Sequence, residues 1–436
     1  MASTFPRVSA GPLVLAVALP FLFLHVRYQP DLGFSAGGTH VGISLSDLAV
    51  LAVALAGLAT AVTTGLDPLR RGLPVWIAAA VLLATVLLSL SYPALRDQPY
   101  DWHARLVSAL KFCEYAALAL AVPLLLRTRD DARLVLRTLV GWSTVATAVG
   151  ILQFLGWVNE FSGRRPAQRE PSLLGIHDLA ALSGGALALG FVALALDEEE
   201  LLGRGWVALA IAAGGLGMVV SGAMTGVIGM WLALAVLTLV AWQRGRLTGR
   251  SITLLATVAA VVTLGTVGMR GTALRDFAAF IGIHRNETPG AVESYAQRTL
   301  LGYIGWKVFL TEPVTGVGYQ GSNDEWAYGP QLAAAHRRFP GQPADAFPST
   351  AHPWGVQNLY VETLADLGVI GSAALVALFA AALALGLRAG SASPLPLVGV
   401  AWLLVAAGVW IGIGIVPGIP LAALTWLGLG LVTLRG

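Results

Sequence analysis

The stretches ITLLATVAAVVTLGTVGMR (residues 252–270) and NLYVETLADLGVIGSAALVALFAAALALGL (residues 358–387) decide the fold of this chain. Each is an almost continuous apolar run, and about 20 such residues form a helix that crosses the ~30 Å hydrocarbon core of a bilayer. The residues between them, Arg270 to Gly355, are polar and carry several arginines and a glycine-proline turn. The pattern predicts two membrane helices joined by one large loop.

The same kind of apolar run recurs along the whole chain. Twelve runs are predicted as helices: 8–26, 43–65, 72–92, 104–126, 133–156, 174–196, 203–221, 223–242, 252–270, 358–387, 395–415 and 417–434. Helices satisfy their own backbone polar groups, which lipid cannot do. We therefore expect an all-α polytopic membrane protein of about 12 transmembrane helices. Its expected parts are helices 1–9 (1–270), a loop domain with short helices (271–357) and helices 10–12 (358–436).

Composition supports this class. Of the 436 residues, 56% are hydrophobic and 12% are charged, whereas about a quarter of the residues in a soluble domain are charged. The net charge of +3 indicates no nucleic-acid partner. A single cysteine, Cys113, leaves no intrachain disulfide and no cysteine metal cluster. The first run has the length of a signal peptide but no clear cleavage site, so we interpret it as a retained helix.

The arginines of the short loops predict the orientation, because such charges concentrate on the cytoplasmic side. With the N-terminus inside, thirteen arginines are cytoplasmic and six are outside. The inner set is Arg7, Arg70, Arg71, Arg127, Arg129, Arg133, Arg137, Arg204, Arg244, Arg246, Arg250, Arg388 and Arg435, and the outer set is Arg27, Arg96, Arg105, Arg164, Arg165 and Arg169. We expect a cytoplasmic (inner) membrane protein with both termini cytoplasmic and the 270–355 loop extracytoplasmic.

This topology limits the chemistry. No cytoplasmic loop is long enough for a nucleotide-binding domain, and the sequence has neither a Walker A nor a Rossmann glycine pattern. There is also no Asp-x-Asp pair for a metal-bound sugar nucleotide. An enzyme working at the outer face must therefore use a substrate that is already activated and carried by the membrane.

Basic side chains of the loop form the first group of candidates. Arginine binds phosphate well because its planar fork donates two parallel hydrogen bonds and stays charged. Arg275, Arg298 and Lys307 are candidates for a diphosphate or lipid head group, with Arg298 singled out because it begins an amphipathic segment. The alternative is that loop arginines such as Arg285, Arg337 and Arg338 are solvated or anchor to head groups.

His352 and the start of the tenth predicted helix form the second group. A histidine can accept a proton from a hydroxyl near neutral pH, and the alternative for His352 is a surface histidine. Asn358, Glu362 and Asp366 recur every four residues and share one helix face. Acidic groups at membrane depth are costly and usually face a cavity or a partner.

Two further polar groups are predicted on the same side of the membrane. Lys111 and Glu114 lie three residues apart in the fourth predicted helix, where the two side chains are placed to pair with each other. The outer loop and the start of the sixth predicted helix carry Arg164, Arg165, Arg169, His177 and Asp178. No chain of polar groups crosses the full bilayer, which indicates a site open to one side only.

Three stretches resemble the O-antigen ligase and O-antigen polymerase superfamily. They are REPSLLGIHDLAA from Arg169, the arginine Arg298 followed by PVTGVG at 313–318, and NLYVETLADLGVIG at 358–371. Their order and spacing, with the large loop before the tenth helix, extend the likeness over nearly the whole chain. The resemblance implies a GT-C-like membrane fold.

The resemblance also implies an activity. Such enzymes transfer a glycan from an undecaprenyl-pyrophosphate carrier to an acceptor hydroxyl outside the inner membrane, without nucleotide or metal. It implies that arginines such as Arg298 hold the diphosphate and that a histidine activates the acceptor, so cell-envelope polysaccharide or lipopolysaccharide synthesis is expected. Alternatives are a polymerase of lipid-linked repeats, a lipid-linked glycan transporter and a non-catalytic binder of the carrier lipid.

Two positions depart from the pattern of that family. Met224 stands where relatives have an arginine, so Arg169 or Arg275 is expected to supply the missing charge. Gln357 stands where relatives have a histidine directly before Asn358. The expectation is that His352 loops back to replace it, with Glu362 as the fallback base.

Overall fold

The computed structural model describes residues 10–30, 32–36, 39–161, 163, 165–196, 201–283, 295–390, 393–416 and 418–434. Its α-helices are α1 (Ala10–Leu22), α2 (Leu45–Thr64), α3 (Leu73–Ser89), α4 (Trp102–Leu125), α5 (Arg129–Phe154), α6 (Ile176–Leu196), α7 (Arg204–Ser221), α8 (Met224–Gln243), α9 (Gly249–Met269), α10 (Gly271–Phe280), α11 (Tyr295–Thr311), α12 (Glu325–Arg338), α13 (Leu359–Ala389), α14 (Leu395–Val409) and α15 (Pro420–Leu431). Short 3-10 helices are η1 (Val26–Tyr28), η2 (Asp67–Gly72), η3 (Ala94–Arg96), η5 (Gly321–Asn323), η6 (Ala344–Ala346) and η7 (Trp410–Gly412). One antiparallel hairpin joins β1 (Phe34–Ala36) to β2 (Thr39–Val41).

Every predicted apolar run overlaps one of the observed helices, so the helical membrane-protein class is confirmed. The count of twelve spans is not, because ten helices in the described part of the chain are long and apolar enough to cross a membrane. The described part of α1 has 13 residues, and α15 has 12. At 1.5 Å per residue α15 is roughly 18 Å long, less than the ~30 Å hydrocarbon core.

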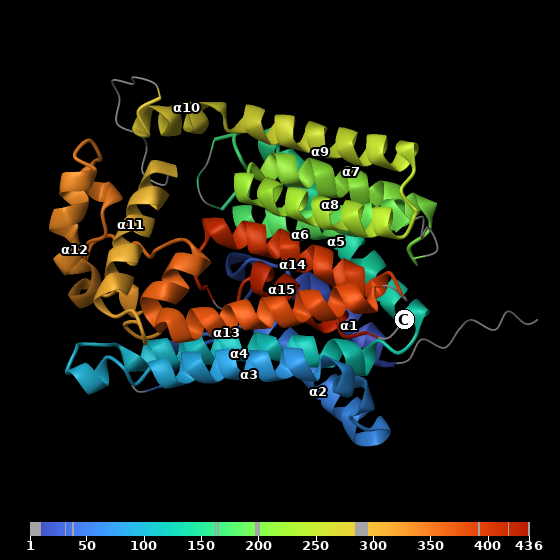
Figure 1. The fold of residues 1–436 in the computed structure, drawn as a ribbon, viewed down its shortest axis with the longest axis horizontal. Helices are drawn as coiled ribbons and strands as arrows, with labels where there is room; N and C mark the ends of the chain where they lie inside the picture. Colours follow the sequence, from blue (N-terminus) through green and yellow to red (C-terminus); the bar gives the residue numbers. More distant parts are fainter. Residues whose placement is uncertain are drawn as a thin grey trace, which may run out of the picture.

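The long helices run side by side, and α10, α11 and α12 gather at one end of the bundle (Figure 1). Helices α6 and α14 form its centre, with 94% and 83% of their spanning windows buried, whereas α2 and α9 are only 28% and 22% buried. The outer helices remain apolar where they are exposed, as at Leu58 and Leu264. Such surfaces suit contact with lipid rather than water.

Close contact between helix backbones holds the centre together. Gly229 of α8 faces Gly408 of α14, and a Cβ atom built on Gly408 would lie 2.3 Å from the Cα of Gly229. Small residues at such crossings let helices approach closely, and the contact then depends on van der Waals packing because lipid is as apolar as the side chains.

The predicted loop domain has its own apolar core. Leu300, Ile304 and Val308 of α11 pack with Tyr328 of α12. Other buried members of this cluster are Leu301, Val317, Ala327, Ala335, Phe347 and Ala365. Since Ala365 belongs to α13, the loop domain packs directly on a membrane helix.

Helix α13 is broken where the segment from Pro313 to Gly318 meets it. Gly368 has φ 62° and ψ −161°, which interrupts the helical geometry. The Val317 and Gly318 N–H groups donate to the Ala365 and Asp366 carbonyls, and the Val369 N–H donates to the Pro313 carbonyl, each at 2.9 Å. The break thus exposes backbone groups of α13 that the 313–318 segment satisfies.

Replacing Gly316 with alanine tests this docking. Gly316 has φ 69°, and a Cβ there would lie 2.3 Å from the carbonyl carbon of Asp366. We expect Gly316→Ala to lower stability by about 2 kcal/mol or more, because a strained backbone must also move away from α13. The measurement is the thermal unfolding midpoint of the detergent-purified protein.

The matched control is Gly302→Ala in α11, where a Cβ meets nothing within 4 Å. It should leave the midpoint unchanged or raise it, since alanine favours helix over glycine. Equal midpoints for both variants would contradict the docking argument.

Candidate functional site

A cavity of about 450 Å³ lies where the loop domain meets the membrane helices. Segments that are distant in sequence form its wall: the start of α6 with Arg169, α11, the 320–323 turn, the segment before α13, and the 412–416 segment after α14. Its polar lining residues are Arg169, His177, Arg298, Gln320, Asn323, Gln357 and Glu362. Cations, amides and one carboxylate therefore share a single hollow.

Two hydrogen bonds orient Arg298 in this wall. Its Nη2 lies 3.1 Å from His177 Nε2, and its Nε donates to Gln357 Oε1 at 3.3 Å. A guanidinium has donors only, so His177 Nε2 must be the acceptor and the proton of a neutral imidazole lies on Nδ1. Among the described residues, Nδ1 is buried with no hydrogen-bond partner. The imidazole is thus held in one tautomer by the arginine.

Positive charge converges on His177 from three elements. Arg169, Arg270 and Arg298 all act electrostatically on this side chain. The turn at Gly222 between α7 and α8 packs against Arg169 and Arg270, because a Cβ there would lie 3.0 Å from Arg169 Cβ and 3.6 Å from Arg270 Cδ. The guanidinium carbon of Arg270 also lies over the ring of Tyr295, 4.9 Å from its centroid. Clustered guanidinium groups favour a multiply charged anion.

Glu362 brings a carboxylate to the same cavity from the first turn of α13. It is 3% exposed, and its Oε2 accepts a hydrogen bond from the Ile415 N–H. A Cβ on Gly414 would collide with this carboxyl, so the 413–416 segment passes directly over it. Asn323 lines the same cavity.

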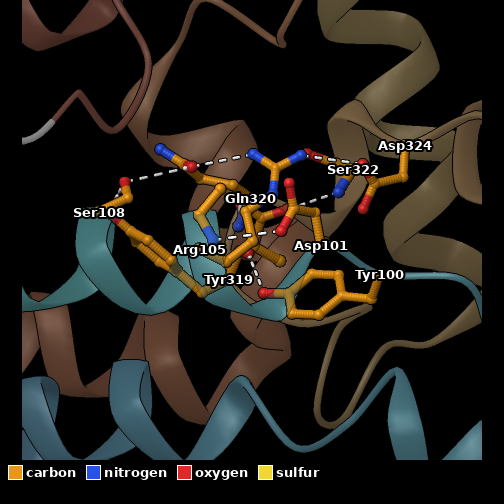
Figure 2. A network of polar contacts seen from close by, with 10 residues as sticks. Tyr100, Asp101, Arg105, Ser108, Tyr319, Gln320, Ser322 and Asp324 are labelled. Carbon is orange, nitrogen blue, oxygen red and sulfur yellow. Dashed lines mark hydrogen bonds and ion pairs between the residues drawn. The ribbon is translucent and has the colours of Figure 1, made fainter. Parts of the chain in front are cut away.

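Gln320 joins this wall to α4, as Figure 2 shows. Arg105 Nη1 donates to Gln320 Oε1 at 2.9 Å, and Arg105 Nη2 contacts Asp324 Oδ1 at 2.8 Å. Because Oε1 accepts, the amide nitrogen of Gln320 faces the other way and donates to the Ile415 carbonyl at 3.2 Å. Burial raises the pKa of the Asp324 carboxyl above its ordinary value, and the Arg105 charge opposes that rise.

Asp366 has a structural role. Its carboxylate accepts the Gln320 and Ser322 N–H groups at 2.7 and 2.9 Å, so it fixes the turn that carries Gln320. Asn358 likewise caps α13, accepting the Tyr360 and Val361 N–H groups at 3.1 Å. Neither side chain is part of the cavity wall.

Some predicted site residues therefore come together and others do not. Arg169, His177, Arg298 and Glu362 line the cavity. Asp178 is buried beside it and accepts the Leu421 N–H at 3.0 Å.

The remaining candidates lie elsewhere. Arg165 and Arg275 are exposed, and Lys307 lies over the ring of Tyr303 at 5.8 Å. His352 is exposed in a tight turn with Ser349 and does not line the cavity. Arg164 and Arg285 lie outside the described residues. Lys111 forms its ion pair with Asp47 of α2 at 2.9 Å, rather than with Glu114, the pairing considered from the sequence.

The sequence analysis did not select Gln320 or Asn323, which line the cavity as neutral amides in a loop, or Arg270, which ends a membrane run. Gln357 was noted only as a departure from the family pattern. Only their position near the PVTGVG and NLYVE stretches hinted at them. Within the described ranges, no three His, Cys, Asp or Glu side chains form a group that could hold a metal ion.

Comparison with protein families gives one match. Residues 208–376 match the family model for O-antigen ligase. This part of the chain is similar to the O-antigen ligase family. The matched segment runs from α7 to α13 and includes Arg298, Gln320, Gln357 and Glu362. No curated protein matches the chain.

The match supports an O-antigen ligase-like or polymerase-like role in glycan assembly. The cavity is the natural site to consider for such a role, because part of its wall lies inside the matched segment.

Replacing Arg105 tests how Gln320 is held. We expect Arg105→Ala to destabilise the protein by roughly 2 kcal/mol, because a partly buried guanidinium loses bonds to two partners. The cost should be smaller at low pH. Without Arg105 the pKa of Asp324 rises further, so the difference in unfolding midpoint between variant and wild type should widen as pH rises above about 4.

Arg70→Ala is the control, since Arg70 and Asp67 form an ion pair with side chains 82% and 70% exposed. Such pairs contribute little. A pH-independent difference for Arg105→Ala would contradict the assigned pairing with Asp324.

Proposed function

We propose that this cavity transfers a glycan from a polyprenyl-pyrophosphate carrier to an acceptor hydroxyl. The observation that carries the proposal is the meeting of Arg298, Arg169 and the carboxylate of Glu362 in one cavity at the loop-domain end of the bundle. A diphosphate on a lipid requires cations close to the membrane surface, and a reacting hydroxyl requires a base. This cavity supplies both from different elements.

The arginine cluster suits the leaving group. As the bond between the anomeric carbon and the diphosphate oxygen breaks, negative charge grows on that oxygen. Guanidinium groups already held in place stabilise this charge without reorganising. The bonds from Arg298 to His177 and Gln357 keep its fork in a fixed orientation.

Glu362 suits the role of general base. The acceptor oxygen forms a bond to the anomeric carbon, its proton passes to the Glu362 carboxylate, and the diphosphate departs with the bonding electrons. Attack on the face away from the leaving group inverts the anomeric centre. Because the Ile415 N–H holds one carboxylate oxygen, the group cannot rotate freely and remains directed at the cavity.

Loss of Arg298 should abolish most transfer. We expect Arg298→Ala to reduce the rate by about 10²- to 10³-fold, the effect of removing one well-placed donor to a developing oxyanion. Arg298→Lys should recover only part, since an ammonium lacks the planar fork. The measurement is mass analysis of products formed by purified protein from a pyrophosphate-linked glycan. Arg275→Ala, on the exposed face of α10, is the control.

Glu362 and His352 are competing candidates for the general base, and variants of each distinguish them. We expect Glu362→Gln to lower the transfer rate by about 10²- to 10⁴-fold, with the hydrogen bond from Ile415 preserved by the amide oxygen. His352→Ala should retain most activity, because His352 does not line the cavity. The opposite result, with His352→Ala inactive and Glu362→Gln active, would return the role to the histidine.

A further inference from the structure

The loop domain has an exposed apolar edge that takes no part in the proposed site. On α11, Trp306 is 45% exposed and Leu310 is 51% exposed, and Val314, in the turn that follows, is 57% exposed. None of these three side chains, here called the α11 edge, lines the cavity. Helix α11 is also not one of the ten described helices that could cross a membrane. The edge therefore needs an explanation other than that of a spanning helix.

The α11 edge continues onto a membrane helix. The Val369 N–H donates to the Pro313 carbonyl at 2.9 Å, and the Ile370 N–H donates to the Val314 carbonyl at 3.4 Å. Val369 and Ile370 of α13 are themselves 48% and 47% exposed. Exposed apolar groups of the loop domain and of α13 thus adjoin, and a continuous patch of this kind marks an interaction surface.

The length of α13 places this junction at one limit of the hydrocarbon core. Residues 369–387 contain no charged side chain, and Arg388 follows them. At 1.5 Å per residue this stretch is about 30 Å long, which equals the thickness of the core. Because Arg388 marks one limit of the apolar stretch, the break at Gly368 lies near the other. The turn that carries Val314 is docked at that break.

Helix α11 directs this edge away from the rest of the protein. Its Gly305 faces the start of α13, because a Cβ there would lie 3.1 Å from Val361 Cγ1. Ile304 and Val308 are buried in the apolar core of the loop domain. The α11 edge lies on the opposite side of the helix, since residues one and five positions after Gly305 are turned about 100° or more from it.

The neighbours of the α11 edge are typical of a bilayer interface. Tyr303 and Lys307 are half-buried next to it, and Lys307 Nζ lies 5.8 Å from the centroid of the Tyr303 ring. Tryptophan and tyrosine concentrate where head groups meet acyl chains, and lysine lays its stem on apolar surface while its ammonium stays in water. Going back along α11 from Val314, the side chains therefore change from apolar to amphipathic. A bilayer has the same gradient, because head groups overlie acyl chains.

We propose that the α11 edge is inserted into the adjoining leaflet of the bilayer, with Val314 and Leu310 among acyl chains and Trp306 at the level of the head groups. Lipid then holds the loop domain at a fixed depth, in addition to the contact with α13. The proposal does not depend on the transfer reaction.

Spin labels on single cysteines test the depth of the edge. In a Cys113→Ala background, Leu310→Cys and Val314→Cys carry the labels, and the purified full chain is reconstituted in phosphatidylcholine vesicles. Oxygen concentrates in the hydrocarbon core, whereas a nickel chelate stays in water. We expect the ratio of oxygen to nickel collisions to shift toward oxygen at both positions, and further at Val314 than at Leu310.

Two control positions define the limits of this ratio. Val376→Cys is 67% exposed in the apolar stretch of α13 and should report hydrocarbon. Ala333→Cys lies on the exposed face of α12 in the loop domain and should report water. All of these side chains are exposed, so labelling them should not disturb packing, and unfolding midpoints confirm that the variants are folded.

A ratio equal to that of Ala333 at either Leu310 or Val314 would overturn the proposal. The vesicles contain no other protein, so only lipid or a second copy of the chain can shield the labels. Dipolar coupling between Leu310 labels on two chains, at a low ratio of protein to lipid, would assign the edge to a second copy and also overturn the proposal.

Discussion

The backbone contact between the 313–318 segment and the broken helix α13 determines how the rest of this structure is placed. A continuous helix would satisfy its own carbonyls and offer nothing to a loop. The positive φ of Gly368 interrupts the helix and leaves the Ala365 and Asp366 carbonyls without helical partners. The Val317 and Gly318 N–H groups donate hydrogen bonds to these carbonyls. Arg96 strengthens the contact by donating to the Gly316 carbonyl and pairing with Glu312. A loop outside the helix bundle thereby becomes a fixed part of it.

This contact explains why polar groups from distant segments meet in one cavity. Asp366, one turn after Glu362, binds the turn that carries Gln320, so one short stretch of α13 provides both a lining carboxylate and the anchor of its neighbour. Arg298 enters on α11, which shares an apolar core with α12 and with Ala365 of α13. Burying these charges is costly unless each has partners, and the hydrogen bonds to His177 and Gln357 supply them.

The fold could be predicted from the sequence to a large extent, whereas the site could be predicted only in part. Apolar runs report helices directly, because every residue of a membrane helix is under the same constraint. Run length placed the end of the first helix at residue 26, whereas α1 ends at Leu22, and it placed the end of the last at 434, whereas α15 ends at Leu431. Arg298 and Glu362 could be chosen because they are charged and near marked turns. Arg270 and Gln320 could not, because their importance comes from elements that meet only in three dimensions. His352 was chosen for its chemistry, and the turn with Ser349 directs it to the surface.

The 413–416 segment connects the contact at α13 to the wall of the cavity. Both backbone polar groups of Ile415 are hydrogen-bonded: its N–H donates to the Glu362 carboxylate, and its carbonyl accepts from the Gln320 side chain. Glu362 belongs to α13 and Gln320 to the turn docked on α13, so both anchors belong to one hydrogen-bonded unit. Arg105 and Ser108 extend that unit to α4 through Gln320 Oε1. We expect a change at any of these contacts to affect the wall segment and the carboxylate together, because hydrogen bonds join Glu362, Ile415, Gln320 and Arg105 in one chain. The geometry of the proposed base is therefore a property of the junction between loop domain and membrane helices, rather than of Glu362 by itself.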